Sequence, residues 1–111
     1  MRIFHLATVS DWTQAQATGS YTTSTRGVSL EQEGYIHASR EDQWRGVHER
    51  YYADADEPLV LLEIDTDLLD ARVVEERPAP EATETFPHVY GPITPLAVVS
   101  ARDVAALLAQ D

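Results

Sequence analysis

The chain contains no cysteine and no lysine among its 111 residues. Without thiols it forms no disulfide, no thiolate metal site and no cysteine nucleophile, and without lysine it has no Schiff-base or P-loop lysine. It also lacks a hydrophobic run near the roughly 20 residues that cross a bilayer, and its first residues do not pair a basic region with a long apolar one. These absences exclude several enzyme classes and predict a cytoplasmic protein without a membrane partner.

Positive charge is scarce in this chain. Its 8 basic residues, all arginine, stand against 19 acidic ones, and the formal net charge is −11. Such a charge repels phosphate backbones at long range, so we expect no nucleic-acid partner. The length suits a single domain over residues 1–111, and a hydrophobic content of 43% is enough for a real core.

We expect a small α+β domain with a bent, mixed β-sheet flanked by two or three helices, and hydrophobic periodicity places the individual strands and helices. The run "PLVLLEID" is apolar on both faces and belongs at the centre of the sheet. Ser39, with Asp42 three positions later, resembles a capping box and predicts a helix that begins at Arg40. The remaining pattern predicts strands over 2–7, 35–38, 71–76, 88–93 and 96–100, and helices over 11–18 and from 103 onward.

Two stretches have no regular hydrophobic period. "SYTTSTRGVSLEQEG" is dense in hydroxyls and predicts a loop with one helical turn at 29–32. "RPAPEATETFP" is acidic and rich in proline, so it predicts a long loop. We expect residues 77–86 to be among the least ordered of the chain.

Three histidines lie inside strand-like apolar runs: His5 in "RIFHLAT", His37 in "GYIHAS" and His88 in "TFPHVYGPI". A buried imidazole needs hydrogen-bond partners. If the three strands adjoin, the rings form one polar cluster that can transfer protons or bind a cation. The alternative is that each ring only satisfies the core.

Three further residues are candidates for ligand binding, each with a structural alternative. Ser39 can face a ligand or cap the helix after it. Arg26, in "TSTRGVS", can hold a phosphate or carboxylate, or remain a solvated loop charge. Tyr90 can stack on a ligand ring or pack as a buried aromatic against the sheet.

Four motifs in order, "FHLATVSDW", "EQEGYIHAS", "LVLLEID" and "FPHVYGPI", resemble the bacterial domain-of-unknown-function family 952 over nearly the whole chain. At a greater distance the chain resembles the ADP-ribosyltransferase-like fold, which binds NAD in a cleft between two small sheets. That resemblance implies a ligand contact by His5 on the first strand and by His37 and Ser39 in the second motif. It also implies a late acidic residue, near which the chain offers His88 and Tyr90, with Glu84 just upstream.

The leading hypothesis is an enzyme or binding protein for a nucleotide-type small molecule, such as NAD or an ADP-ribose derivative. In it, His5, His37 and His88 are the candidate catalytic residues, and His5, Arg26, Ser39 and Tyr90 the candidate cofactor-binding residues. Two alternatives stay open. One is a metal-assisted hydrolase in which the three histidines bind Zn²⁺, although the usual short histidine pairs are missing. The other is a noncatalytic interaction module.

Overall fold

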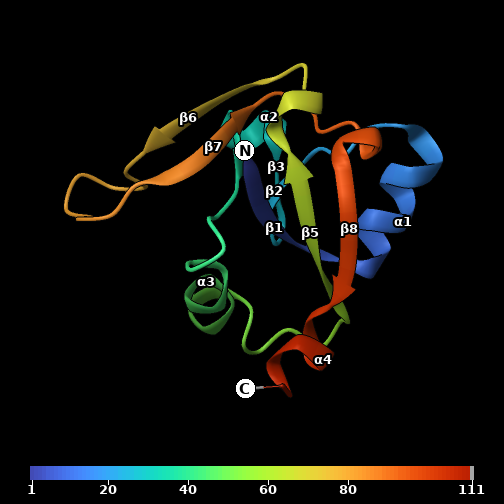
Figure 1. Cartoon of the computed structure of the whole chain (residues 1–111). Coiled ribbons are helices and arrows are strands. Elements are labelled where there is room, and N and C mark those ends of the chain that lie inside the picture. The colour runs from blue at the N-terminus through green and yellow to red at the C-terminus, as the bar shows by residue number, and fades with distance from the viewer. Residues whose placement is uncertain (111) are drawn as a thin grey trace.

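The computed structural model describes residues 1–110 and is built on a three-stranded central sheet. Strands β1 (Arg2–Thr8), β5 (Leu59–Asp65) and β8 (Val98–Asp103) pair antiparallel in the order β1-β5-β8 (Figure 1). The prediction that "LVLLEID" is the central strand is confirmed. Its apolar side chains alternate between two buried faces, and so both faces of the sheet are covered.

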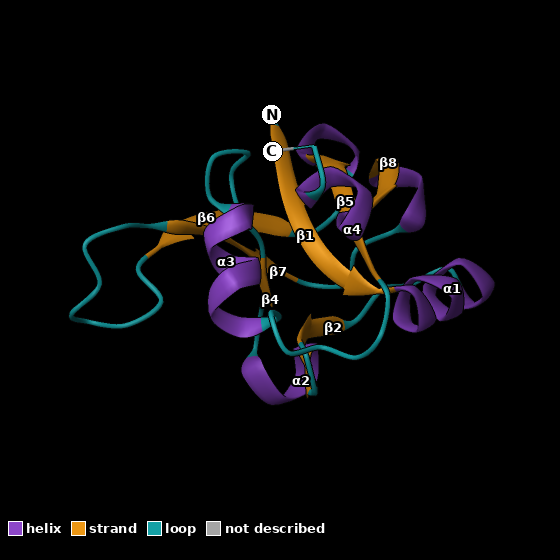
Figure 2. Cartoon of the chain, turned by 90° about the horizontal axis from the view of Figure 1, so that it is seen from below, coloured by secondary structure: helices purple, strands orange, loops and turns teal. Residues whose placement is uncertain are grey.

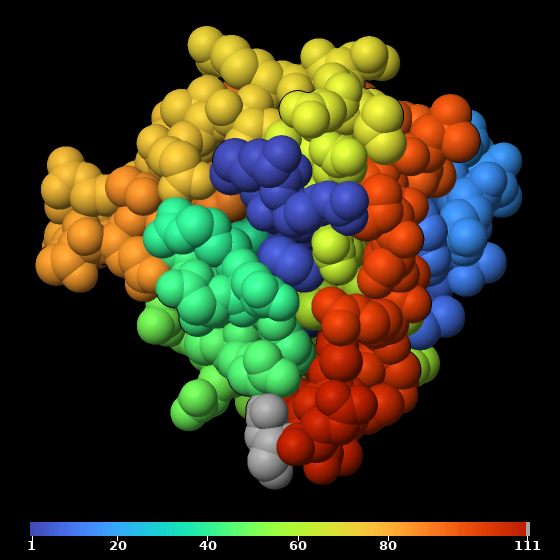
Figure 3. Space-filling view, viewed as in Figure 1, coloured from blue at the N-terminus to red at the C-terminus, as the bar shows by residue number. Residues whose placement is uncertain are grey.

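A second three-stranded sheet carries two of the three histidines. It contains β4 (Ile36–His37), β7 (Phe86–Tyr90) and β6 (Arg72–Glu76) in the order β4-β7-β6, and His37 lies directly opposite His88. The backbones of Phe4 and Ser39 exchange two hydrogen bonds of 2.7 Å, which join this sheet to β1. The β6–β7 hairpin protrudes from one side of the molecule (Figure 3).

The expectation of one mixed sheet is therefore wrong. Within residues 1–110 all strand pairs are antiparallel, and they form three sheets, the third being the hairpin of β2 (Thr23–Thr25) and β3 (Val28–Ser29). Parallel neighbours need long crossover connections. Here β6 and β7 are joined by a hairpin, and this connection can return the chain only antiparallel.

In the described part of the chain four α-helices surround the sheets, against the two or three expected (Figure 2). Helix α1 (Val9–Thr18) is capped by Thr8 and ends at Gly19, whose φ of 84° is the left-handed conformation that glycine adopts readily. The other three are α2 (Leu30–Glu33), α3 (Trp44–Tyr51) and α4 (Val104–Leu108). Two 3₁₀ turns complete the elements, η1 (Thr66–Leu68) and η2 (Pro95–Ala97). No helix within residues 1–110 is long and apolar enough to span a membrane.

The core has one cluster on each face of the central sheet. Leu62 and Ile64 of β5 pack with residues of α1 and of the second sheet, such as Ala15 and Val89. On the opposite face, Leu61 packs with residues of α3 and α4. The chain thus forms three layers, and β1 lies at the sheet edge where these layers meet α3.

Ser39 does not cap a helix, contrary to the sequence prediction. Helix α3 begins four residues later than expected, at Trp44, and its N-cap residue Gln43 makes no side-chain cap hydrogen bond. The Gln43 carboxamide instead accepts a hydrogen bond from the Arg40 backbone at 2.8 Å. Because the Ser39 backbone pairs with Phe4, residue 39 belongs to the sheet junction, and the helix cannot start there.

The two expected loops differ in outcome. Residues 20–34 contain the β2–β3 hairpin, which the sequence did not predict, and the predicted helical turn, which is α2. Ser29 caps α2 in a capping box with Gln32. Residues 77–85 connect β6 to β7 without a helix or strand, as predicted, although the second strand begins two residues earlier than expected, at Phe86.

Candidate functional site

A pocket of about 250 Å³ opens where β1, β4 and α3 meet. His5 and His37 both line it, as does Ser39. The opposite wall comes from α3 and its end, with Arg50 and Tyr52, and Phe86 of β7 closes one side. The structure therefore brings three of the six predicted site residues to one small cavity whose wall includes Tyr52 and Phe86.

His5 is fixed by hydrogen bonds at both ring nitrogens. Nδ1 lies 2.5 Å from the backbone oxygen of His37, and Nε2 lies 2.8 Å from the hydroxyl of Tyr21. Because a carbonyl only accepts, Nδ1 carries the proton and Nε2 accepts from Tyr21. Burial lowers the pKa of His5 to about 4, so the ring is neutral at pH 7. A ring with both nitrogens engaged supports the pocket wall and has no nitrogen left for proton transfer.

His37 is the histidine with a free nitrogen at the pocket. Its Nε2 lies 3.2 Å from a carboxylate oxygen of Glu33, and its side chain is 32% exposed. Burial lowers the pKa of His37, and the hydrogen bond to Glu33 acts in the opposite direction. Since an ionised carboxylate only accepts, Glu33 holds the proton on Nε2 and leaves Nδ1 with a lone pair.

Local structure explains how Glu33 reaches His37. Glu33 ends the short helix α2, and Gly34 follows it with a φ of 94°, a left-handed conformation that turns the chain into β4. This turn places two residues four positions apart side by side, although no helix joins them. The capping box between Ser29 and Gln32 fixes the start of the same turn.

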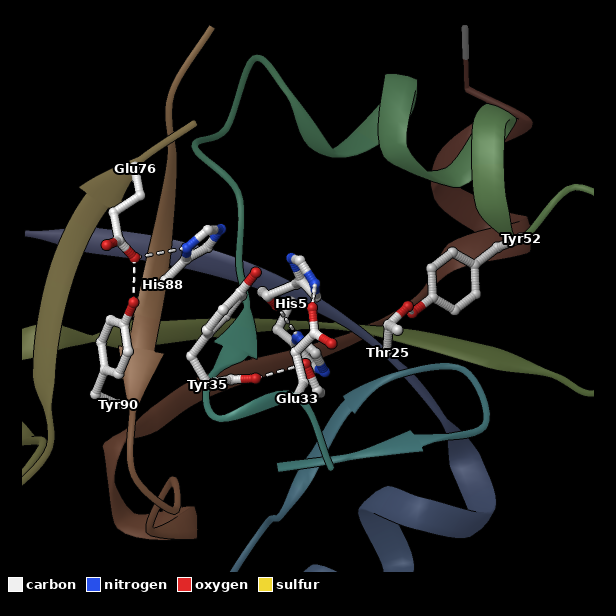
Figure 4. Close-up of polar contacts among 10 residues, drawn as sticks. His5, Thr25, Glu33, Tyr35, Tyr52, Glu76, His88 and Tyr90 are labelled. Carbon is white, nitrogen blue, oxygen red and sulfur yellow. Dashed lines mark hydrogen bonds and ion pairs between the residues drawn. The ribbon is translucent and has the colours of Figure 1, made fainter. Parts of the chain in front are cut away.

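His88 lies behind His37, buried from solvent, and does not line the pocket. Its Nδ1 is 2.9 Å from a Glu76 carboxylate oxygen that also accepts a short hydrogen bond from Tyr90 (Figure 4). These two hydrogen bonds lower the pKa of Glu76, and the bond to Glu76 raises the pKa of Tyr90. The ring of Tyr35 stacks on that of His88 with centroids 4.0 Å apart.

The structure places the other predicted residues outside the pocket. Arg26 pairs with Asp54 at 2.9 Å and lines a separate polar pocket beside α1. Tyr90 faces Glu76, and the Arg72 guanidinium lies 5.4 Å from its ring. Glu84 lies in the loop after β6, where its carboxylate accepts a hydrogen bond from the Gln43 side chain. The late acidic residue implied by the resemblance is therefore not at the pocket.

Arg50 at the pocket has no carboxylate partner in the described part of the chain, and its guanidinium lies 5.8 Å from the ring centroid of Tyr51. In a chain of net charge −11, an arginine at a pocket that forms no ion pair within residues 1–110 favours anion binding. Sequence reasoning missed this residue because the pattern "HERYYADAD" shows only a polar helix end. It also missed Glu33, since Gly34 separates it from the strand of His37.

Within residues 1–110, no three His, Asp or Glu side chains are arranged to hold a metal ion. The reason is visible at the histidines. Both ring nitrogens of His5 are occupied by protein atoms, and Nδ1 of His88 is bonded to Glu76. The three rings therefore do not converge as a zinc site requires, and the metal-assisted alternative has no support from this geometry.

The fold and the pocket define an α+β domain of antiparallel sheets with a histidine-lined cavity. A sequence model of the family described as "Protein of unknown function (DUF952)" matches residues 6–101, and the chain belongs to that family. Its fold is similar to the crystal structure of Protein CC0527 from Caulobacter crescentus, with a TM-score of 0.75 and 25% identity over 93% of this chain and 85% of that chain. A double mutant of CC0527 is similar to the same degree, with 24% identity. No curated protein matches the chain.

Proposed function

We propose that the chain binds a nucleotide-type anion in the pocket beside β1 and that His37 acts there as a general base. The single observation that carries the proposal is the His37–Glu33 pair at the pocket wall. Glu33 orients the ring, and burial keeps it neutral, so that Nδ1 offers a lone pair to a hydroxyl or water held in the pocket. A carboxylate behind an imidazole is the arrangement that general bases commonly have.

The rest of the wall supports a ligand with both a ring and a negative charge. Tyr52 and Phe86 offer aromatic surface, and Arg50 offers a guanidinium for a phosphate or carboxylate. The cavity of about 250 Å³ is small for a ligand site, so it suits one ring and its sugar, with the remainder of a dinucleotide outside. The resemblance to ADP-ribosyltransferase-like proteins makes NAD and ADP-ribose the first compounds to test.

Binding is measured by calorimetry with NAD and with ADP-ribose. Arg50→Gln removes the charge at the pocket, and we expect its affinity to fall about tenfold, the equivalent of about 1.4 kcal/mol. Arg102→Gln is the matched control, because it removes one positive charge on β8, away from the pocket. Equal losses in the two variants would show that Arg50 makes no specific contact, and a wild-type protein that binds neither compound would refute the nucleotide.

Catalysis is tested separately from binding. If NAD is consumed, His37→Gln and Glu33→Gln should both slow the reaction by a larger factor than they weaken binding, since the base acts mainly in the transition state. Release of nicotinamide is the measurement. An unchanged rate of nicotinamide release in both variants would show that His37 is not the general base.

A further inference from the structure

The buried nitrogen Nε2 of His88 has no hydrogen-bond partner within residues 1–110. An unpartnered buried polar atom costs free energy, and native proteins contain few of them. The other nitrogen of this ring faces Glu76, an acceptor whose pKa is lowered and which is therefore ionised at neutral pH. Glu76 thus holds the proton of His88 on Nδ1, and Nε2 is left as a buried acceptor without a hydrogen-bond donor within residues 1–110.

His37 is the neighbour that can supply that donor. The two residues are direct cross-strand partners, and their ring centroids lie 5.2 Å apart with an interplanar angle of 87°. For two imidazoles at this separation, nitrogens that face one another lie within hydrogen-bond distance, about 3 Å. The ring of His37 makes one side-chain hydrogen bond within residues 1–110, to Glu33 at 3.2 Å, so it can turn Nδ1 from the pocket toward His88 after taking up a proton.

We propose that His37 and His88 form a proton-sharing pair, in which a proton that His37 accepts at Nδ1 is held by a hydrogen bond to Nε2 of His88. In the step, the O–H bond of the ligand hydroxyl or water breaks and its electron pair stays on oxygen. The lone pair of Nδ1 forms the new N–H bond. The chain of contacts then runs from Glu33 through both imidazoles to Glu76, with a carboxylate at each end and one added proton between the rings.

The surroundings of the pair favour one shared proton over two separate ones. Two full positive charges on adjacent buried rings would repel each other, whereas one charge between two carboxylates is compensated from both sides. Tyr35 stacks on His88 with centroids 4.0 Å apart and meets the ring of His37 edge-on at 5.0 Å, so one aromatic ring contacts both imidazoles. The titratable and charged groups around the pair are Glu33 on α2, Tyr35 before β4, His5 on β1, Glu76 and Arg72 on β6, and Tyr90 on β7.

His88 would then be a positioning residue that strengthens His37 as a base, although it does not touch the ligand. This inference rests on the proposed function of His37. The pair itself can be detected without any ligand, so its failure and that of the proposed function are distinguishable. The measurement is the titration of the ¹⁵N-labelled histidine rings by NMR between neutral pH and pH 4, in wild type and in Glu76→Gln.

In wild type we expect a direct ¹⁵N–¹⁵N coupling across the hydrogen bond between Nδ1 of His37 and Nε2 of His88, which develops as His37 takes up its proton. In Glu76→Gln the proton of His88 is no longer fixed on Nδ1. The coupling should then weaken or vanish, and the midpoint for His37 should move to lower pH by about half a unit or more. Glu75→Gln is the matched control, because Glu75 is the adjacent acidic residue of β6 and pairs with Arg40. It removes the same charge without touching His88.

The direction in which the His37 titration midpoint shifts in Glu76→Gln distinguishes a proton shared between the two rings from simple repulsion between them. If the two rings only repel each other, loss of the carboxylate behind His88 weakens the repulsion, and His37 titrates at higher pH. A rise, or a shift no larger than that of Glu75→Gln, would overturn the inference. His88→Phe keeps an aromatic ring stacked on Tyr35 and removes the acceptor nitrogen. If Glu76→Gln fails to fold, the direction of the His37 midpoint shift in His88→Phe gives the same test. A wild-type coupling in a protein that binds neither NAD nor ADP-ribose would support the pair and refute only the ligand.

Discussion

Replacement of His5 by Gln should change how the stability of the protein depends on pH. His5 is 3% exposed and its pKa is lowered from 6.5 to about 4, first of all by burial. His5 therefore becomes protonated below about pH 6.5 in the unfolded chain, but only below about pH 4 in the folded chain. Because the unfolded state binds more protons in this window, acidification favours unfolding, and the contribution is fully present above pH 6.5.

The magnitude follows from the two pKa values. Between pH 7 and pH 5 the wild type should lose about 2 kcal/mol of stability through His5 alone, and about 3 kcal/mol by pH 4. His5→Gln keeps a polar side chain that does not titrate in this range, so it should lack this part of the loss. All other titrating groups are common to both proteins and cancel in the difference.

The assay is urea unfolding of both proteins at pH 7, 5 and 4, followed by circular dichroism. The free energy of unfolding of His5→Gln should be lower than that of wild type at pH 7, because two buried hydrogen bonds are disturbed, and the gap should narrow or reverse toward pH 4. Tyr21→Phe is the control, since it removes one of these bonds but keeps the titrating ring. A gap between wild type and His5→Gln that stays constant from pH 7 to pH 4 would refute the reasoning.

Three further outcomes are expected. His37→Ala should weaken binding of NAD or ADP-ribose tenfold or more at little cost in stability, because the His37 ring is part exposed and makes one long hydrogen bond. Thermal melting and calorimetry test this. A large loss of stability with unchanged affinity would show that His37 is a core residue. Ser29→Ala should cost about 1 kcal/mol in urea unfolding through the lost capping box, with Thr22→Ala, an exposed neighbour, as control. Amide hydrogen exchange should be fast over 77–83 and slow over 59–64; equal protection would show that the loop is structural.

The strands and the histidine cluster were predictable because their signals are local. The run at 59–64 is apolar at every position that faces a core, and so its place at the sheet centre follows from composition alone. The three histidine strands do come together, with His37 opposite His88 and the ring of His5 against the His37 carbonyl. Buried imidazoles need partners, and one of these rings, His5, finds its partner in the backbone of another histidine, His37.

The rest depends on contacts between distant residues, which no local pattern carries. Ser39 has the sequence of a helix cap, yet its backbone is engaged by Phe4, and this tertiary contact overrides the local preference. The partners of His37 and His88 are glutamates whose positions give no signal in the sequence, since Glu33 ends a helical turn and Glu76 ends a different strand. Pairing direction was also hidden, because antiparallel order is set by connections and not by the strands themselves.

The two hydrogen bonds between Phe4 and Ser39 have a consequence for how the protein is made. They join the first strand to a segment of the second sheet, and the pocket beside them also needs α3 and Phe86, the first residue of β7. No contiguous fragment short of β7 contains the whole cavity, and contacts of such long sequence separation form slowly. During synthesis the chain can therefore bind nothing in this pocket until most of it has left the ribosome. Any ligand that fits will select, and stabilise, only the fully assembled domain.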